Sequence, residues 1–204
     1  MAQTDKSTYH HGNLKQDLME SAVKRLAKGG IENLSLRSIS REIGVSQTAP
    51  YRHFSNKNEL LVALAIRGFE ELTHEMVRAD RDEDICIRLQ QISIAYISYA
   101  RKNPEIYRLL FGTGIVDRDD YQSLCVAGDE TYFVLVNLID EGIKSGAFRN
   151  MPTMYLANSV WSLVHGLATL IIDDNFSALG EALIAEQLDA SVAFLVAGAT
   201  SKQD

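Results

Sequence analysis

The chain has 204 residues, enough for one large helical domain or for a small domain joined to a larger one. Hydrophobic residues make up 46% and charged residues 23%, which is ordinary for a soluble globular protein with a real core. No apolar stretch of about 18 residues or more occurs, which argues against a membrane-spanning helix.

The N-terminal segment and the cysteines both indicate the cytoplasm. The first segment, MAQTDKSTYHHGN, is polar and lacks the apolar core of a signal peptide. Cys86 and Cys125 match no metal-binding or disulfide spacing. We therefore expect a cytoplasmic protein that needs no metal, no cofactor and no membrane.

The net charge of −7 is unevenly distributed along the chain. Residues 1–60 carry nine Lys or Arg against six Asp or Glu, whereas residues 61–204 carry eleven against twenty-one. A small basic segment attached to a large acidic one is able to bind phosphates with one end only. An excess of three positive charges is also what a solvated face carries by chance, so charge alone does not decide the function.

Four helices are predicted in the first third of the chain. The first follows an N-cap at Asn13 and ends at Gly29 and Gly30, and the second runs from a cap at Ser35 to Gly44. A third, short helix holds Tyr51 and Phe54, and a fourth begins at residue 55 or 56. Three helices within about fifty residues, the last two joined by a tight glycine turn, are typical of a helix-turn-helix domain.

The remainder shows no strand alternation and predicts further helices near residues 84–102, 104–111, 120–145, 152–173 and 180–199. Pro104 and Pro152 fall where the first turn of a helix tolerates proline. The expected fold is therefore all-α, with about nine helices. It consists of an N-terminal three-helix helix-turn-helix domain and a larger helical ligand-binding and dimerisation domain.

The last two predicted helices favour self-association. From Tyr155 to Ile172 apolar residues occupy nearly every face, and a helix that is apolar all round must be buried all round. Two such helices that pair with their copies across a two-fold axis would form a four-helix interface. The alternative is a monomer with a thick core. We expect the homodimer.

The stretch LSLRSISREIGVSQTAPYRHFSNKNEL, residues 34–60, has the chemistry that DNA reading requires. Gln47, Thr48 and Ala49 stand at the start of the third helix, where side chains meet base edges. Glutamine binds adenine in a bidentate way, and the methyl groups of threonine and alanine contact thymine. Pro50 lacks an N–H, so this helix must begin close to Gln47 or Thr48.

Lys57 falls in the first turn of the fourth helix, where the helix dipole disfavours a cation. A lysine at this position is explained if an anion such as a DNA phosphate lies between it and the free backbone N–H groups. Arg37 repeats the pattern at the second helix. The alternative is a solvated lysine at a cost of a few tenths of a kcal/mol.

The run Ile39, Gly44-Val45-Ser46, Tyr51, His53-Phe54, Lys57 and Leu60 resembles the DNA-binding signature of the tetracycline-repressor family of transcriptional regulators. The match covers about residues 12–62 without gaps, although Thr48 and Pro50 replace residues common in the family. YHHGNL before the first helix and the W-x-x-x-H-G pattern of Trp161, His165 and Gly166 resemble one branch of it.

This resemblance implies a DNA-binding domain at residues 1–57, an effector-binding and dimerisation domain at residues 58–204, and a dimer formed through the last two helices. It also implies contacts with double-stranded DNA. The residues expected to face DNA are Arg37, Ser46, Gln47, Thr48, Ala49, Tyr51, Arg52, His53 and Lys57.

A pocket for a small apolar or aromatic effector is expected between the helices of the larger domain. The candidate lining residues are Tyr96, Tyr99, Tyr107, Phe111, Phe133, Trp161 and His165. Aromatic residues at helical spacing are more often plain core. For His165 the alternatives are contact with an effector and a bond to a neighbouring buried group, and we favour the second.

The predicted function is a ligand-responsive repressor that binds a pseudo-palindromic operator as a dimer. A helical enzyme is the first alternative, but no GxSxG, Walker A, GxGxxG or HExxH pattern occurs. An interaction protein that uses the helix-turn-helix only for packing is the second. Packing alone would not select the polar groups of Gln47, Arg52 and Lys57.

Overall fold

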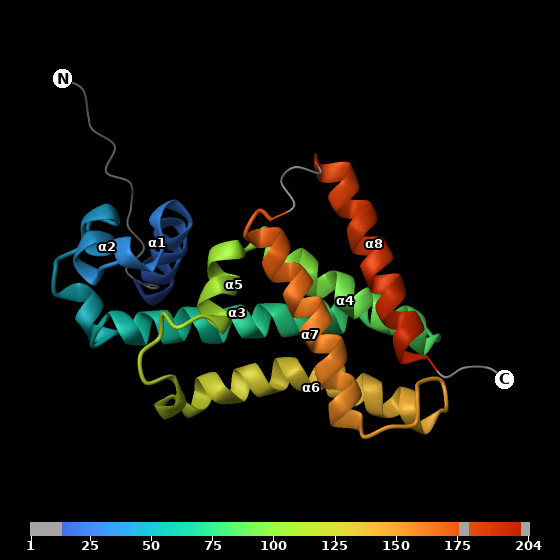
Figure 1. The fold of residues 1–204 in the computed structure, drawn as a ribbon. Coiled ribbons are helices and arrows are strands. Elements are labelled where there is room, and N and C mark those ends of the chain that lie inside the picture. Colours follow the sequence, from blue (N-terminus) through green and yellow to red (C-terminus); the bar gives the residue numbers. More distant parts are fainter. Residues whose placement is uncertain (1–13, 176–179, 201–204) are drawn as a thin grey trace. The chain divides into compact units, whose positions relative to one another are not determined.

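The structure is a computed structural model that describes residues 14–175 and 180–200, with only the backbone described at residues 180–185. In this part of the chain all regular secondary structure is helical, and the one β-type contact is an isolated bridge between Phe148 and Thr200. This confirms the all-α prediction. The elements are α1 (Leu14–Gly29), η1 (Ile31–Asn33), α2 (Leu36–Glu42), η2 (Ala49–Arg52), α3 (Lys57–Ala79), α4 (Ile85–Lys102), α5 (Pro104–Phe111), η3 (Arg118–Asp120), α6 (Gln122–Lys144), α7 (Thr153–Ile172) and α8 (Gly180–Ala199), where η denotes a 3-10 helix (Figure 1).

The chain separates into two compact units, Met1–Leu64 and Ala65–Asp204. The division falls inside α3, so the first turns of this helix belong to the N-terminal unit. The domain boundary expected at residue 57 coincides with the start of α3.

Glycine and serine residues set the limits of the first two helices. Gly30 has φ 66° and Gly44 has φ 73°, a left-handed backbone that glycine adopts without steric cost. The side chain of Ser35 accepts from the backbone N–H of Ser38, whose hydroxyl in turn bonds the backbone of Ser35. The predicted ends and the predicted cap are thus confirmed here, whereas the cap expected at Asn13 lies outside the described residues.

The predicted third helix takes a different form. η2 begins at Ala49, near the predicted start, but it is a 3-10 turn and ends at Arg52, before Phe54. Pro50 stands in its first turn and has no N–H to bond the carbonyl of Ser46 in an α-helical pattern. The N–H of Ala49 takes that carbonyl at 3.1 Å instead, in the shorter 3-10 pattern.

α3 begins with a reciprocal cap. The backbone N–H of Glu59 donates to Oδ1 of Asn56 at 3.0 Å, and the N–H of Ser55 donates to Oε2 of Glu59 at 2.7 Å. Side chains thus satisfy two donors at this end of the helix, as in a capping box. This agrees with the start predicted at residue 55 or 56.

In the C-terminal unit, α7 packs against α4, α6 and α8, and crosses α4 and α6 in Figure 1. The predicted helices agree with α4 to α8 within two residues at each end. Asp84 caps α4 by accepting from the N–H groups of Cys86 and Ile87, and Pro104 opens α5. The capping chemistry explains why these limits were predictable.

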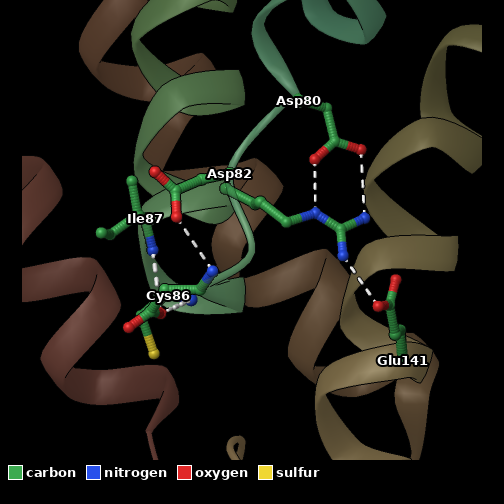
Figure 2. A network of polar contacts seen from close by, with 7 residues as sticks. Asp80, Asp82, Cys86, Ile87 and Glu141 are labelled. Atoms are coloured by element: carbon green, nitrogen blue, oxygen red, sulfur yellow. Dashed lines mark hydrogen bonds and ion pairs between the residues drawn. The ribbon is translucent and has the colours of Figure 1, made fainter.

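Arg88 of α4 holds three elements of this unit together. Its Nε and Nη2 meet the two carboxylate oxygens of Asp80, just after α3, at 2.6 and 3.2 Å. Its Nη1 meets Glu141 of α6 at 2.7 Å, and Figure 2 shows both carboxyl groups reaching the one guanidinium. The two hydrogen-bonded carboxylates raise the pKa of Arg88 above its ordinary value.

α7 departs from the expectation about membrane spans. By length and composition, Thr153–Ile172 is apolar enough to cross a membrane, and 33% of that stretch is buried. Core helices of soluble proteins pass the same test. Tyr155 is 64% exposed and Leu170 45% exposed, so α7 keeps apolar surface that the described part of the chain leaves uncovered. The same holds on α8, where Phe194 is 74% exposed.

Candidate DNA-binding surface and ligand cavity

Seven of the nine residues predicted to face DNA lie in or next to η2, and the other two, Arg37 and Lys57, lie on α2 and α3. Ser46, Gln47 and Thr48, which precede η2, are exposed, and the hydroxyls of Ser46 and Thr48 lie 3.2 Å apart. Tyr51 is 49% exposed, whereas Ala49 is half-buried. The exposed turn therefore presents amide, hydroxyl and methyl groups, which are the groups that read base edges.

Buried apolar side chains support this turn. Pro50 and Phe54 are both buried, and the N–H of Phe54 donates to the carbonyl of Pro50 at 3.0 Å. Arg52 and His53, between them, are exposed. The turn is thus anchored by two residues while its cationic and imidazole groups remain available to a phosphate.

Arg37 and Lys57 occupy different environments. Arg37 is exposed on α2, whereas Lys57 is half-buried, and its Nζ donates to the carbonyl of Ile31 at 2.6 Å. This bond ties α3 to η1, across 26 positions of the sequence. It provides a structural reason for a lysine at the start of α3, beside the phosphate contact that the sequence suggests.

The C-terminal unit contains a cavity of about 460 Å³ that opens to the surface, within the size range of small-molecule sites. The cavity is mostly apolar, with a few polar groups. Its lining residues are Phe69, Met76, Ile92, Ser93, Tyr96, Leu110, Phe111, Gly112, Arg118, Gly128, Asp129, Thr131, Tyr132, Leu135, Asn158, Val160, Trp161 and Val164.

Three of the seven aromatic and histidine candidates line this cavity: Tyr96, Phe111 and Trp161. Their rings contact one another, with centroids of Phe111 and Tyr96 at 6.3 Å and those of Phe111 and Trp161 at 6.5 Å. α4, α5 and α7 each contribute one of them, so residues far apart in sequence build one aromatic wall.

Tyr107 and His165 are absent from the lining, but both bond Tyr96. Nδ1 of His165 lies 2.9 Å from the Tyr96 hydroxyl and 2.7 Å from the Tyr107 hydroxyl, and the two hydroxyls are 3.1 Å apart. Desolvation lowers the pKa of His165, raises the pKa of Tyr107 to about 12, and raises that of Tyr96 further. The three groups are therefore neutral at pH 7 and form a closed polar cluster beside the cavity.

The other two candidates lie elsewhere. The hydroxyl of Tyr99 donates to Oε2 of Glu71 at 3.4 Å, and burial raises the pKa of this tyrosine. Phe133 is 49% exposed on α6. It lies two positions from Thr131 and Leu135, which are buried and line the cavity, so the helical period turns Phe133 to another face.

The polar part of the lining was not among the sequence candidates. Arg118 and Asp129 are charged, and Asn158 accepts the hydroxyl hydrogen of Tyr132 at 2.6 Å. These residues come from η3, α6 and α7. Nothing in their local sequence marks them, because only the packing of these helices brings them to one cavity.

An N-terminal unit with an exposed polar turn, followed by a separate helical unit with a mostly apolar cavity, defines the class of helix-turn-helix transcription regulators. Residues 18–64 match the profile of bacterial regulatory proteins of the tetR family, and residues 89–198 match the tetracyclin repressor-like C-terminal domain. The chain belongs to the TetR family and is a DNA-binding regulator rather than an enzyme.

Individual relatives are distant. The nucleoid occlusion factor SlmA of Haemophilus ducreyi is 26% identical over 80% of this chain and 83% of its own. The uncharacterized HTH-type transcriptional regulator YobS of Bacillus subtilis is 22% identical over 92% of this chain and 93% of its own.

Solved structures agree with the fold. A protein of unknown function from Rhodococcus sp. RHA1 has a TM-score of 0.85 and 28% identity, covering 96% of this chain and 100% of its own. The regulator FadR of Bacillus subtilis, solved in complex with stearoyl-CoA, has a TM-score of 0.74 at 15% identity, covering 90% of this chain and 98% of its own.

Proposed function

We propose that this regulator is a homodimeric repressor of the cytoplasm that binds a pseudo-palindromic operator and releases it when a small effector enters the cavity. In this proposal the residues around η2 read the bases, and residues 58–204 bind the effector and form the dimer. The observation that carries the proposal is the combination of an exposed polar turn in one unit with a mostly apolar cavity in the other.

The proposed DNA contacts are of two kinds, contacts with base edges and contacts with phosphates. Gln47, Thr48 and Ala49 supply the groups that distinguish base pairs. Arg37, Tyr51, Arg52, His53 and Lys57, with Ser46, supply the groups that position a protein on the phosphates. Lys57 has three donors, and its bond to the carbonyl of Ile31 uses one of them.

The dimer is proposed to form through α7 and α8. A surface groove between these helices is lined by Leu163, Leu167 and Leu170, by Phe194, and by the small or polar residues Ser162, Gly166, Gln187, Ala190 and Ser191. Small side chains allow a partner helix to approach closely, and the exposed ring of Phe194 supplies apolar area that a partner would bury. A two-fold axis makes such a surface self-complementary.

The proposed response to the effector uses α3. This helix begins with Lys57 in the N-terminal unit and carries Phe69 and Met76, which line the cavity. An effector that prefers one arrangement of α3 by about 1–3 kcal/mol would lower operator affinity by the corresponding 5- to 150-fold. FadR, solved with stearoyl-CoA, is a fold relative that holds a ligand.

The test begins with selection of bound duplexes from a random library, followed by anisotropy titration of the selected sequence. The expected consensus is an inverted repeat, preferred over random duplex by roughly 10³-fold or more. Sedimentation of the complex should give two chains per repeat. Equal affinity for random duplex, or a single chain on each site, would contradict the proposal.

A further inference from the structure

We propose that the effector is an amphipathic monoanion whose carboxylate pairs with Arg118 while its apolar body fills the aromatic part of the cavity. This inference rests on the proposed function, because it specifies the ligand of the same cavity. It depends on Arg118, the only cationic residue among the described residues that line the cavity.

The guanidinium of Arg118 has an unmet bonding requirement. Its Nη1 is buried and has no hydrogen-bond partner among the described residues. Its carbon Cζ lies 5.7 Å from the ring centroid of Phe69, which lines the cavity too. A buried donor without a partner is costly, and the cost is greater for a charged group. A ligand carboxylate at this position would remove that cost and add a charge-assisted hydrogen bond.

The rest of the cavity selects an apolar body. Ile92, Leu110 and Val164 add aliphatic surface to the aromatic wall of Tyr96, Phe111 and Trp161. The Tyr96 hydroxyl is already bonded to His165 and Tyr107, so this tyrosine offers the ligand its ring more than a polar group. A ligand charged at both ends would leave one charge against this wall without a partner.

Asp129 is the one carboxylate among the described residues of the lining, and it would repel a bound anion. It is more exposed to solvent than Nη1 of Arg118. Its side chain is exposed, so water solvates its charge, whereas Nη1 of Arg118 is shielded from solvent. Screening therefore weakens the repulsion between Asp129 and a bound anion. The buried charge of Arg118 therefore outweighs the solvated charge of Asp129, and the cavity should prefer an anion to a cation. Comparing an anionic with a cationic amphiphile tests this preference.

Trp161 makes the test direct, since it is the only tryptophan of the chain and it lines the cavity. The full-length protein is titrated with decanoate, decan-1-ol and decyltrimethylammonium while its tryptophan fluorescence is recorded. Decanoate should bind more tightly than decan-1-ol by roughly 10- to 100-fold, the range of one charge-assisted hydrogen bond. Decyltrimethylammonium should bind most weakly.

Arg118→Gln should remove the preference for decanoate and leave the affinity for decan-1-ol unchanged. Because the variant also removes a buried donor without a partner, its thermal midpoint should stay equal to that of the wild type or rise. Arg81→Gln, which changes an exposed arginine in the segment between α3 and α4, is the matched control and should behave as the wild type.

Three results would overturn the proposal: equal affinity for decanoate and decan-1-ol, tighter binding of the cationic amphiphile, or a preference for decanoate that survives Arg118→Gln. These outcomes are separable from failure of the proposed function. Specific operator binding without an anion preference leaves the repressor intact and rejects the ligand class. An anion preference without any effect of decanoate on operator binding supports the ligand class and rejects the regulatory response.

Discussion

The hydroxyl of Tyr107 lies 2.7 Å from Nδ1 of His165, and this contact joins α5 to α7. The same nitrogen reaches Tyr96 of α4 at 2.9 Å, so one imidazole connects three helices of the C-terminal unit. Of the two roles considered from the sequence, ligand contact and a bond to a buried neighbour, the geometry supports the second for His165. Its ring still packs on Trp161, with centroids 5.2 Å apart.

This cluster should make stability depend on pH. Burial holds the pKa of His165 below its ordinary value of 6.5, so the unfolded chain takes up the proton first as the pH falls. The stabilisation by the neutral imidazole is complete above pH 6.5 and is lost as the pH falls from there toward the lowered folded-state pKa. His165→Asn removes this titration. The thermal midpoint of the wild type should therefore fall more than that of the variant between about pH 7.5 and pH 5.5. Parallel curves for the two proteins would exclude this role of His165.

Gly166 offers a clean test of the proposed dimer. A Cβ at this position meets no atom of the described residues within 4 Å, so there is open space where a longer side chain would begin. Gly166→Glu should raise the dimer dissociation constant at least tenfold, because it places an unpaired charge in the apolar groove. Analytical ultracentrifugation over a dilution series measures it.

Gly166→Ala is the matched control. It should remain dimeric and should gain up to about 1 kcal/mol of unfolding free energy, since glycine is a poor helix former. A Gly166→Glu protein that dimerises like the wild type would place the interface elsewhere on the molecule.

Gln47 is expected to read one base pair. Gln47→Ala should reduce discrimination at a single position of each half-site, by about 1–3 kcal/mol, and leave affinity for random duplex almost unchanged. Binding to a panel of operators with single substitutions measures the effect. Equal loss on every operator would refute base reading by this residue.

Lys57 is expected to have two roles, a structural bond within the N-terminal unit and a contact with a DNA phosphate. Lys57→Ala removes the bond to the carbonyl of Ile31 and should lower the unfolding free energy by about 1–2 kcal/mol. If the ammonium also meets a phosphate, the variant should weaken binding to all duplexes alike and reduce the salt slope by about one. Lys28→Ala, at an exposed site near the end of α1, controls for net charge. An unchanged salt slope would leave Lys57 with the structural role alone.

The contact of Arg88 with Asp80 and Glu141 should stabilise the C-terminal unit. Arg88→Ala leaves Asp80, which is 23% exposed, without its bidentate partner. We expect a loss of about 1–2 kcal/mol, less than for a fully buried pair because Glu141 is 56% exposed and solvent screens it. Urea unfolding measures the loss, and Arg81→Ala is the exposed control. An equal effect of the two substitutions would show that the contact contributes no stability.

Local chemistry made the helices of this chain predictable. Ser35, Asp84 and Pro104 act within one turn of their own position, and Gly44 closes α2 by its own backbone conformation. The 3-10 form of η2 was not predictable in the same way. The missing N–H of Pro50 limits where a helix begins, but whether the turn then follows an α-helical or a 3-10 pattern depends on which N–H takes the carbonyl of Ser46.

The site was predictable only in part, because its polar contacts join distant segments. Lys57 bonds a carbonyl 26 positions upstream, and His165 bonds residues 58 and 69 positions away. Arg118 belongs to a short turn with no helical period, so no pattern directs it toward a cavity. Aromatic residues could be listed as candidates from their type, but their division between cavity, cluster and surface depends on packing.

α7 has one side in the cavity, through Val160, Trp161 and Val164, and another in the surface groove, through Leu163 and Gly166. If the groove joins two copies, a ligand in the cavity and the second copy in the groove contact different sides of the same helix, α7. Thermodynamic linkage then requires that a ligand which weakens the dimer binds the dimer less tightly than it binds the monomer. The factor by which it raises the dimer dissociation constant equals the corresponding loss of ligand affinity. The concentration of the protein would thereby set the dose of ligand needed, and a cell with many copies would respond later than a cell with few.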